Sequence, residues 1–216
     1  MIKAVIFDMN GVIIDDEQFH REAWRRYCKR HGFRLTEDDF KHHVFGTTEK
    51  DTFQFLYGRS LSDAEVESFS NERVDEVIEL VKSRATVPPG LKDLIEDITS
   101  AGMKLGIATS ARRRYFNFVM DQLKLREYFS AVLTAQDVHK GKPDPEIYVG
   151  CAKRLQVDPR ECVVIEDTIS GIKSGQAADM KVIAITTTHP KDELTIADLI
   201  VSSFKELSIE RIENLI

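Results

Sequence analysis

The fold is decided by the stretch Lys3–Glu17, which reads KAVIFDMNGVIIDDE. Its residues Ala4–Phe7 form an unbroken apolar run, which is typical of a strand buried in a parallel sheet. The run ends in Asp8, and Asn10 and Gly11 follow it. Because ligands of open α/β sheets bind just beyond the carboxyl ends of the strands, Asp8 and Asn10 stand where chemistry is expected. Gly11 allows the backbone to turn tightly behind them.

The composition is that of an ordinary globular protein. The chain has 216 residues, of which 42% are hydrophobic, enough for a substantial core. Its 30 basic and 36 acidic residues give a net charge of -6, so nothing in the overall charge favours nucleic acid or an anionic membrane as a partner. There is no apolar run of ~18 residues, as a membrane span needs, and no signal-peptide pattern at the start. We expect a cytoplasmic protein that is a monomer or a weak dimer and binds a small molecule.

The three cysteines are far apart in the sequence. Cys28, Cys151 and Cys162 include no Cys-x-x-Cys pair, so nothing suggests a redox or zinc motif. We expect them to be buried thiols in a reducing compartment.

A long block after the first strand is predicted to be entirely helical. Apolar residues recur at three- and four-residue steps in the first helix, from residue 17 to His31. Thr36 and Ser62 are each followed by acidic residues in the pattern of a helix N-cap, and another helix is expected from Gly46-Thr47-Thr48 to about Tyr57. We therefore predict a separate helical cap domain at residues 16–83.

The remaining residues, 1–15 and 84–216, alternate strands with helices and are predicted to form the core domain. This alternation implies right-handed crossovers and a doubly wound, Rossmann-like parallel sheet. The fold class is thus α/β, with an inserted all-helical cap. The later elements expected are helices at 91–100, 112–123, 168–178 and from 208, a helix with Asp144 as its cap and Pro145 at its first position, and strands at 104–108, 131–134, 162–165, 182–185 and 199–201.

Polar residues follow three of the predicted strands, and one lysine lies in a loop beside them. Taken singly, each has an ordinary interpretation as a turn residue, a helix cap or a solvated charge. Together, at strand ends that meet at one edge of the sheet, they predict a site in which clustered carboxylates need a cation, and their oxygen ligands suit Mg²⁺ better than zinc. The set comprises Asp8, Asn10, Thr109, Ser110, Lys142, Glu166 and Asp167.

These residues occur in four short motifs that resemble, in order, those of the haloacid dehalogenase superfamily. The helical insert is similar to the cap of the β-phosphoglucomutase-like phosphatase branch, and His20–Trp24 resembles the start of its cap helix. The resemblance covers nearly the whole chain. The four motifs are residues 8–12 (DMNGV), 107–110 (IATS), 141–145 (GKPDP), and 165–168 (IEDT) with 170–172 (SGI).

The resemblance implies a role for each site residue. Asp8 would attack phosphorus and form an aspartyl-phosphate, which water then hydrolyses. Mg²⁺ would be held by Asp8, by the main-chain oxygen of Asn10 and by Asp167, with Glu166 in support. The Thr109 hydroxyl, the Ser110 N–H and Lys142 would neutralise the phosphate oxygens. The cap would close over the site and contribute substrate contacts, with His20 as a candidate partner of a substrate hydroxyl and Trp24 as a pocket wall.

Two positions depart from the family pattern. Asn10 replaces an aspartate that protonates the leaving group and then activates water, and a carboxamide does neither. In the stretch Gly46-Thr47-Thr48-Glu49, Glu49 replaces an arginine that clamps the distal phosphate of a sugar bisphosphate in β-phosphoglucomutase. Glu49 could instead bind a second cation, supply the missing acid and base, or be a solvated helix-start residue. Arg73 and Lys50 are further candidate cations of the cap.

The leading hypothesis is Mg²⁺-dependent hydrolysis of a small phosphorylated metabolite through Asp8. Three alternatives stay open: a β-phosphoglucomutase-type phosphosugar mutase, an inorganic pyrophosphatase, and a phosphate-ester binder that lost turnover because of Asn10. An engineered Asp-to-Asn change would give the same sequence.

Overall fold

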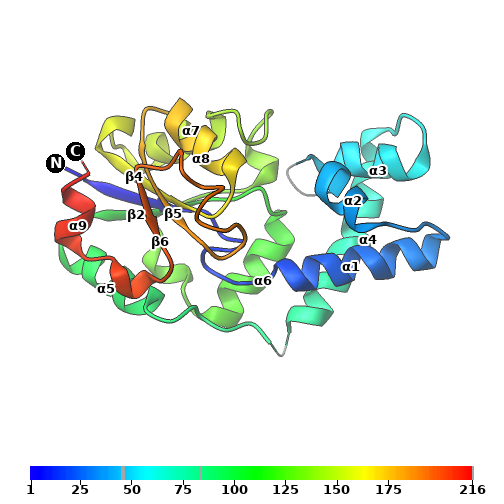
Figure 1. The fold of residues 1–216 in the computed structure, drawn as a ribbon, viewed down its shortest axis with the longest axis horizontal. Coiled ribbons are helices and arrows are strands. Elements are labelled where there is room, and N and C mark those ends of the chain that lie inside the picture. Colours follow the sequence, from blue (N-terminus) through cyan, green and yellow to red (C-terminus); the bar gives the residue numbers. More distant parts are fainter. Residues whose placement is uncertain (45–46, 83, 216) are drawn as a thin grey trace. The chain divides into compact units, whose positions relative to one another are not determined.

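The computed structural model describes residues 1–44, 47–82 and 84–215, which divide into two compact units (Figure 1). The α/β unit comprises Met1–Asp15 and Ala85–Ile216, and the helical unit comprises Asp16–Arg84. Arg84 therefore belongs to the helical unit rather than to the core, where the sequence placed it. Gly46 and Ser83, which bounded predicted segments, lie outside the described residues.

The α/β unit is built on a six-stranded, wholly parallel sheet with the order β3-β2-β1-β4-β5-β6. Strands are added first on one side of β1 and then on the other, so the order reverses between β1 and β4. This arrangement confirms the predicted doubly wound α/β class and makes the β1–β4 boundary the expected binding edge. The strands are β1 (Ala4–Phe7), β2 (Lys104–Ala108), β3 (Ala131–Leu133), β4 (Cys162–Glu166), β5 (Lys181–Ile185) and β6 (Leu199–Val201).

Strand β1 is central because its side chains are apolar on both faces. All four residues of Ala4–Phe7 are fully buried. Ala4 and Ile6 pack into one core cluster with Tyr148 and Cys151, whereas the Phe7 ring contacts Phe129 at 5.9 Å between centroids. The main-chain N–H of Asp8 still bonds to Ile165 O at 3.0 Å, which fixes this residue at the edge of the sheet.

Helices cover both faces of the sheet. In Figure 1, α7 and α8 lie on one side of it and α5 and α9 on the other. The ranges are α5 (Leu91–Ser100), α6 (Arg113–Leu123), α7 (Glu146–Leu155), α8 (Ile169–Ala177) and α9 (Ile209–Glu213).

The start of α7 differs from the prediction by one residue. Pro145 precedes the helix, with φ -74° and ψ -5°, and Glu146 is the first helical residue. The Asp144 carboxylate does accept a hydrogen bond from the Glu146 N–H at 3.0 Å. Asp144 N–H in turn bonds to Gly141 O, and Pro145 O accepts a hydrogen bond from Val149 N–H at 3.0 Å, so Pro145 is the N-cap residue and not the first helical residue.

The helical unit contains α1 (Glu17–His31), α2 (Glu37–Asp39) continued by a π-helical turn (Phe40–Val44), α3 (Glu49–Tyr57) and α4 (Asp63–Val81). Thr36 and Ser62 form the expected capping boxes with Asp39 and Glu65. Its core consists of aromatic and aliphatic side chains, among them Trp24, Tyr27, Phe40, Phe53 and Val66.

Cys28, Cys151 and Cys162 are buried free thiols, as predicted. Burial raises the pKa of Cys28 to about 11, so this thiol stays protonated and unreactive near neutral pH.

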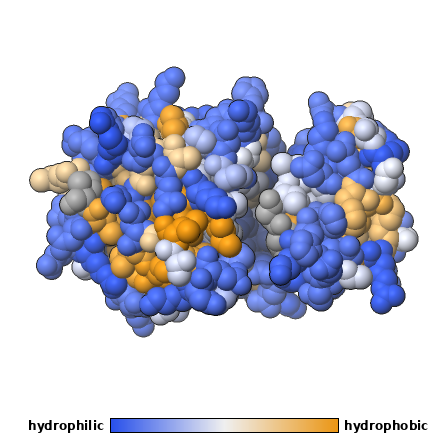
Figure 2. All heavy atoms as spheres, turned by 45° about the horizontal axis from the view of Figure 1, so that its top comes forward, coloured by the Kyte–Doolittle hydropathy of each residue, from blue (hydrophilic) through white to orange (hydrophobic). Residues whose placement is uncertain are grey.

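The surface is mainly hydrophilic in the face that Figure 2 shows, where apolar side chains gather in a few patches. None of the helices within the described ranges is long and apolar enough to cross a bilayer.

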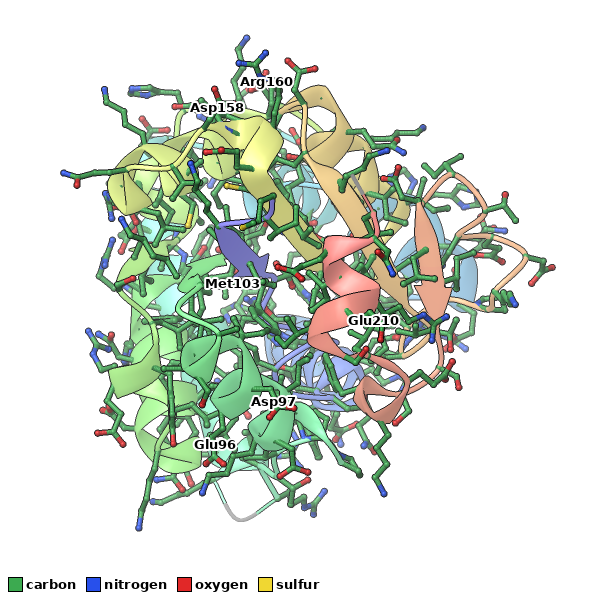
Figure 3. All side chains as sticks on the ribbon, turned by 90° about the vertical axis from the view of Figure 1, so that its left-hand side faces the viewer. Glu96, Asp97, Met103, Asp158, Arg160 and Glu210 are labelled. Atoms are coloured by element: carbon green, nitrogen blue, oxygen red, sulfur yellow. The ribbon has the colours of Figure 1, made fainter. Side chains whose placement is uncertain are left out.

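Figure 3 looks onto the amino-terminal end of the sheet, where Met103 precedes β2 and Asp158 and Arg160 precede β4. Asp158 and Arg160 form a local ion pair of 2.9 Å there. The polar residues that follow β1, β2 and β4 in the sequence, such as Asp8, Thr109 and Asp167, lie at the opposite ends of the strands.

A half-buried acid, Asp137, whose side chain is 12% exposed, links three segments of the α/β unit. Its carboxylate accepts hydrogen bonds from Thr134 N–H and Oγ1, both at 2.8 Å, from Arg154 at 2.9 Å, and from Arg113. Burial alone would raise the pKa of Asp137, but these hydrogen bonds and charges hold it below its ordinary value. The carboxylate must therefore be ionised to stabilise the fold.

We expect Asp137→Ala to lower the free energy of unfolding by about 1–3 kcal/mol at about pH 7, because Thr134 and Arg154 lose their acceptor. The wild-type advantage is complete above the pKa of an unfolded aspartate, about 4, and is lost as the pH falls through the lower folded pKa. Urea unfolding at about pH 7 and pH 3 measures this difference. Asp97→Ala, at an exposed position of α5 (Figure 3), is the control. If the difference in the free energy of unfolding between Asp137→Ala and wild type is as large at about pH 3 as at about pH 7, the ionised carboxylate of Asp137 is not what stabilises the fold.

Candidate active site

Lys142 joins the carboxylates at the ends of β1 and β4. Its Nζ donates to Asp8 Oδ1 at 2.6 Å, to Glu166 Oε1 at 2.7 Å and to Ala108 O at 3.1 Å. The Asp8 and Lys142 side chains are only 10% and 6% exposed, and that of Glu166 is 1% exposed. Asp8 and Lys142, which are 134 positions apart in the sequence, thus form one buried, charged cluster with Glu166 at the predicted edge.

Glu166 is held by hydrogen bonds at both of its oxygens. The Tyr148 hydroxyl donates to Oε1 at 3.0 Å, and Oε2 accepts from Asp167 N–H, Thr168 N–H and Thr168 Oγ1, each at 2.9 Å. A Cβ on Gly171 would lie 1.7 Å from Oε1, so this position has no room for a side chain. Glu166 therefore orients Lys142, in keeping with a supporting role rather than direct metal ligation.

The charges of this cluster alter its proton affinities. Burial alone would lower the pKa of Lys142, but the carboxylates of Asp8 and Glu166 raise it well above its ordinary value. Burial would likewise raise the pKa of Glu166, but Lys142 and the bonds from Thr168 lower it. Lys142 is thus a permanent cation and Glu166 a permanent anion at neutral pH.

Asp167 differs from its neighbours because no described cation contacts it. Its Oδ2 accepts a hydrogen bond from the Thr188 hydroxyl, whereas its buried Oδ1 has no hydrogen-bond partner among residues 1–44, 47–82 and 84–215. Burial, together with the charges of Glu166 and Asp8, raises its pKa well above the ordinary value.

The donor set fits a divalent cation bound by few side chains. Lys142 pairs with the carboxylates of Asp8 and Glu166, and the carboxylate of Asp167 lies within their electrostatic influence, so three acids share one lysine and negative charge is left uncompensated. In the part of the chain that the structure describes, no three His, Cys, Asp or Glu side chains form a ready-made metal cluster. An ion that takes two carboxylates, main-chain oxygen and water, as Mg²⁺ does, suits this arrangement.

Asn10 and Thr109 lie beside this cluster. The Thr109 hydroxyl is 3.5 Å from Asn10 Oδ1, and it accepts a hydrogen bond from Ala111 N–H at 3.0 Å. Gly11, at φ +73°, makes the turn that follows Asn10, and its N–H bonds to Ile14 O at 2.7 Å. The next residue after Thr109, Ser110, is exposed and precedes α6.

In the helical unit, His20, Trp24 and Glu49 gather around Arg73. Arg73 Nε donates to Glu49 Oε1 at 3.1 Å, and its guanidinium lies 5.0 Å from the centre of the Trp24 ring. Trp24 also packs against Phe53, at 5.1 Å between ring centres. Glu49 is therefore salt-bridged to Arg73, whose side chain is 9% exposed, and is not merely a solvated helix-start residue.

The partners of His20 define its tautomer. Arg73 Nη1 can only donate, so His20 Nδ1, at 3.2 Å, is the acceptor. Nε2 then carries the proton that bonds to Asp16 Oδ2 at 3.2 Å. The His20 ring is thus oriented from both sides, by Arg73 and by Asp16.

Comparison with known proteins assigns the family. The model of haloacid dehalogenase-like hydrolases matches residues 5–185. Validoxylamine A 7'-phosphate phosphatase of Streptomyces hygroscopicus subsp. limoneus is 30% identical over 96% of both chains. A phosphorylated carbohydrates phosphatase of Thermotoga maritima is 32% identical over 83% of both chains. The crystal structure of β-phosphoglucomutase from Clostridium difficile, 28% identical, superimposes with a TM-score of 0.87 over 100% of this chain and 97% of that one. The chain belongs to the haloacid dehalogenase-like hydrolases, in their β-phosphoglucomutase-like branch.

Proposed function

We propose that this protein is a Mg²⁺-dependent phosphatase that removes phosphate from a small phosphorylated sugar or polyol through an aspartyl-phosphate at Asp8. The observation that carries the proposal is the buried cluster in which Lys142 holds Asp8 beside Glu166, with Asp167 next in sequence. A turn residue would not need a buried lysine partner on a distant loop.

Asp8 has the properties of a nucleophile. Its pairing with Lys142 favours the ionised carboxylate and fixes its orientation. An oxygen of Asp8 forms a bond to phosphorus while the bond from phosphorus to the leaving oxygen breaks, and the leaving oxygen takes up a proton from solvent. Water then attacks phosphorus and gives up a proton to solvent, the bond to Asp8 breaks, and inorganic phosphate is released.

The residues around Asp8 suit the charge that develops on the phosphoryl group. Lys142, the Thr109 hydroxyl and the Ser110 N–H would stabilise the phosphate oxygens, as preorganised donors do in phosphoryl transfer. Mg²⁺ would be held by Asp8, Asp167 and the main-chain oxygen of Asn10, where it would neutralise the same oxygens. The buried Oδ1 of Asp167 supports this assignment, because a carboxylate oxygen is costly to bury without a partner.

The substrate class is suggested by relatives that act on phosphorylated carbohydrates and on validoxylamine A 7'-phosphate. We propose that His20, Trp24 and Glu49 take part in recognising the organic portion, since Arg73 orders all three within the helical unit. His20 Nε2–H and the Arg73–Glu49 pair offer donors and acceptors that match hydroxyl groups.

One observation favours phosphosugar mutase activity as a second candidate. Glu49 stands where β-phosphoglucomutase has an arginine, but Arg73 supplies a guanidinium at Glu49 and partly offsets its charge. A mutase requires interconversion of glucose 1-phosphate and glucose 6-phosphate with a bisphosphate primer. Phosphate release without interconversion would assign the chain to the phosphatases.

The direct test is phosphate release from a panel of sugar phosphates, polyol phosphates and pyrophosphate. We expect release from at least one carbohydrate phosphate with Mg²⁺, a loss of at least about 10²-fold in EDTA, and recovery when Mg²⁺ is restored. Hydrolysis that is equally fast in EDTA would contradict the metal assignment. Tight binding of a phosphate ester with no turnover would identify a binder.

A further inference from the structure

The loop after β5 reaches the candidate metal carboxylate from a strand that the sequence motifs do not include. Strands β4 and β5 are neighbours, with Glu166 paired to Ala184. The Thr188 hydroxyl donates a hydrogen bond to Asp167 Oδ2 across this pair of strand ends. The start of the loop is fixed as well, because Thr186 N–H bonds to Val201 O of β6 at 3.0 Å.

Gly11 packs directly against this hydrogen bond. A Cβ on Gly11 would lie 1.8 Å from Asp167 Oδ2 and 2.8 Å from Thr188 Oγ1. The turn after β1 and the loop after β5 therefore confine the same carboxylate oxygen. A side chain confined in this way has little freedom to rotate.

The other oxygen of this carboxylate has a different environment. Asp167 is 2% exposed, and its Oδ1 is buried with no hydrogen-bond partner in the described ranges. An unpaired, buried carboxylate oxygen costs free energy unless a ligand satisfies it. The Thr188 hydroxyl bonds to Oδ2, so Oδ1 is the oxygen available to a metal ion. Groups outside a metal's coordination sphere commonly orient its carboxylate ligands by hydrogen bonds of this kind.

We propose that Thr188 is a positioning residue, which fixes Asp167 by a hydrogen bond to Oδ2 so that Oδ1 binds the divalent cation. The inference rests on the proposed metal-dependent function and adds a residue from outside the four motifs. Thr188 contacts Asp167 rather than phosphorus or the leaving group. Its loss should therefore weaken cation binding first and turnover only as a consequence.

Thr188→Val tests this, since valine has nearly the shape of threonine but no hydroxyl. Mn²⁺ serves as the probe, and its dissociation constant is measured by electron paramagnetic resonance without substrate. We expect Thr188→Val to raise this constant by about 10- to 100-fold. Thr188→Ser, which keeps the hydroxyl, should restore binding to near the wild-type value. Thr187→Val, at the exposed neighbouring position, is the matched control and should bind as wild type does.

A purely structural role for Thr188 predicts another pattern. In that case Thr188→Val lowers the melting temperature in EDTA while the Mn²⁺ dissociation constant stays at the wild-type value, and this result overturns the proposal. If Thr188→Val does not fold, Thr188→Ala, measured beside Thr188→Ser, decides in the same way. If the wild type hydrolyses substrate only with a cation, and Thr188→Val binds Mn²⁺ as the wild type does, the role of Thr188 is refuted while the proposed function stands. A wild-type protein that binds no Mn²⁺ refutes the proposed function too.

Discussion

Asp8→Asn is expected to lower kcat for phosphate release by about 10⁴-fold or more, because an amide oxygen is not an anionic nucleophile. The substitution preserves the shape of the side chain, and Lys142 keeps Glu166, 2.7 Å away in the wild type, as an anionic partner. The variant should therefore fold and retain substrate binding while turnover is lost. Phosphate release and the melting temperature, measured on the same preparation, separate these effects.

Asp121→Asn is the matched control for this variant. Asp121 is exposed on α6, so the same chemical change should leave activity and stability at wild-type levels. An Asp8→Asn variant with near wild-type kcat would refute Asp8 as the nucleophile, whatever the identity of the substrate.

Asn10→Asp is the second substitution with a large expected effect, and it should raise activity. A carboxyl group in this position can protonate the leaving oxygen and then take a proton from the attacking water, which an amide cannot do. General acid–base catalysis contributes about 10²–10⁴-fold, which corresponds to about 3–5 kcal/mol of activation barrier. We expect a gain of this size in kcat on substrates with alcohol leaving groups.

The gain should depend on the leaving group. Aryl phosphates and pyrophosphate have leaving groups that depart with little protonation, so Asn10→Asp should change their rates much less than those of alkyl phosphates. Rates on a series of phosphate esters with graded leaving-group pKa values measure this difference for both proteins. The wild type should show the steeper dependence.

Equal rates for wild type and Asn10→Asp on every ester would mean that another group performs the proton transfer. If neither protein turns over any ester, and both bind one tightly, the chain is a binder.

Asn10→Ala is the control for the amide, because it keeps the main-chain oxygen of residue 10 and removes only the side chain. It should leave Mn²⁺ binding unchanged.

Most of the fold could be predicted because its signals are local. The apolar run Ala4–Phe7 ends in a polar turn, and Thr36 and Ser62 carry capping patterns that depend on residues three positions away. The reach of Lys142 to Asp8 also follows from topology, since parallel strand ends meet at one edge. The structure, rather than the sequence, gives the distances.

The rest depends on contacts between distant side chains, for which the sequence has no periodic signal. Neither the bond from Tyr148 to Glu166 nor that from Thr188 to Asp167 belongs to a motif. The salt bridge between Arg73 and Glu49 spans 24 positions, so the sequence named both residues as candidates of the cap but could not pair them. Such pairs are decided by tertiary packing alone.

The central claim is that phosphate passes through a covalent bond to Asp8. The most direct measurement is to mix wild-type protein with substrate and Mg²⁺, quench in acid within the first turnover, and analyse its peptides by mass spectrometry. The account predicts one added phosphoryl group on the peptide that contains Asp8, its removal by hydroxylamine, and no such adduct in Asp8→Asn. A protein that releases phosphate while the Asp8 peptide stays unmodified, or that carries the phosphoryl group on another residue, would contradict it.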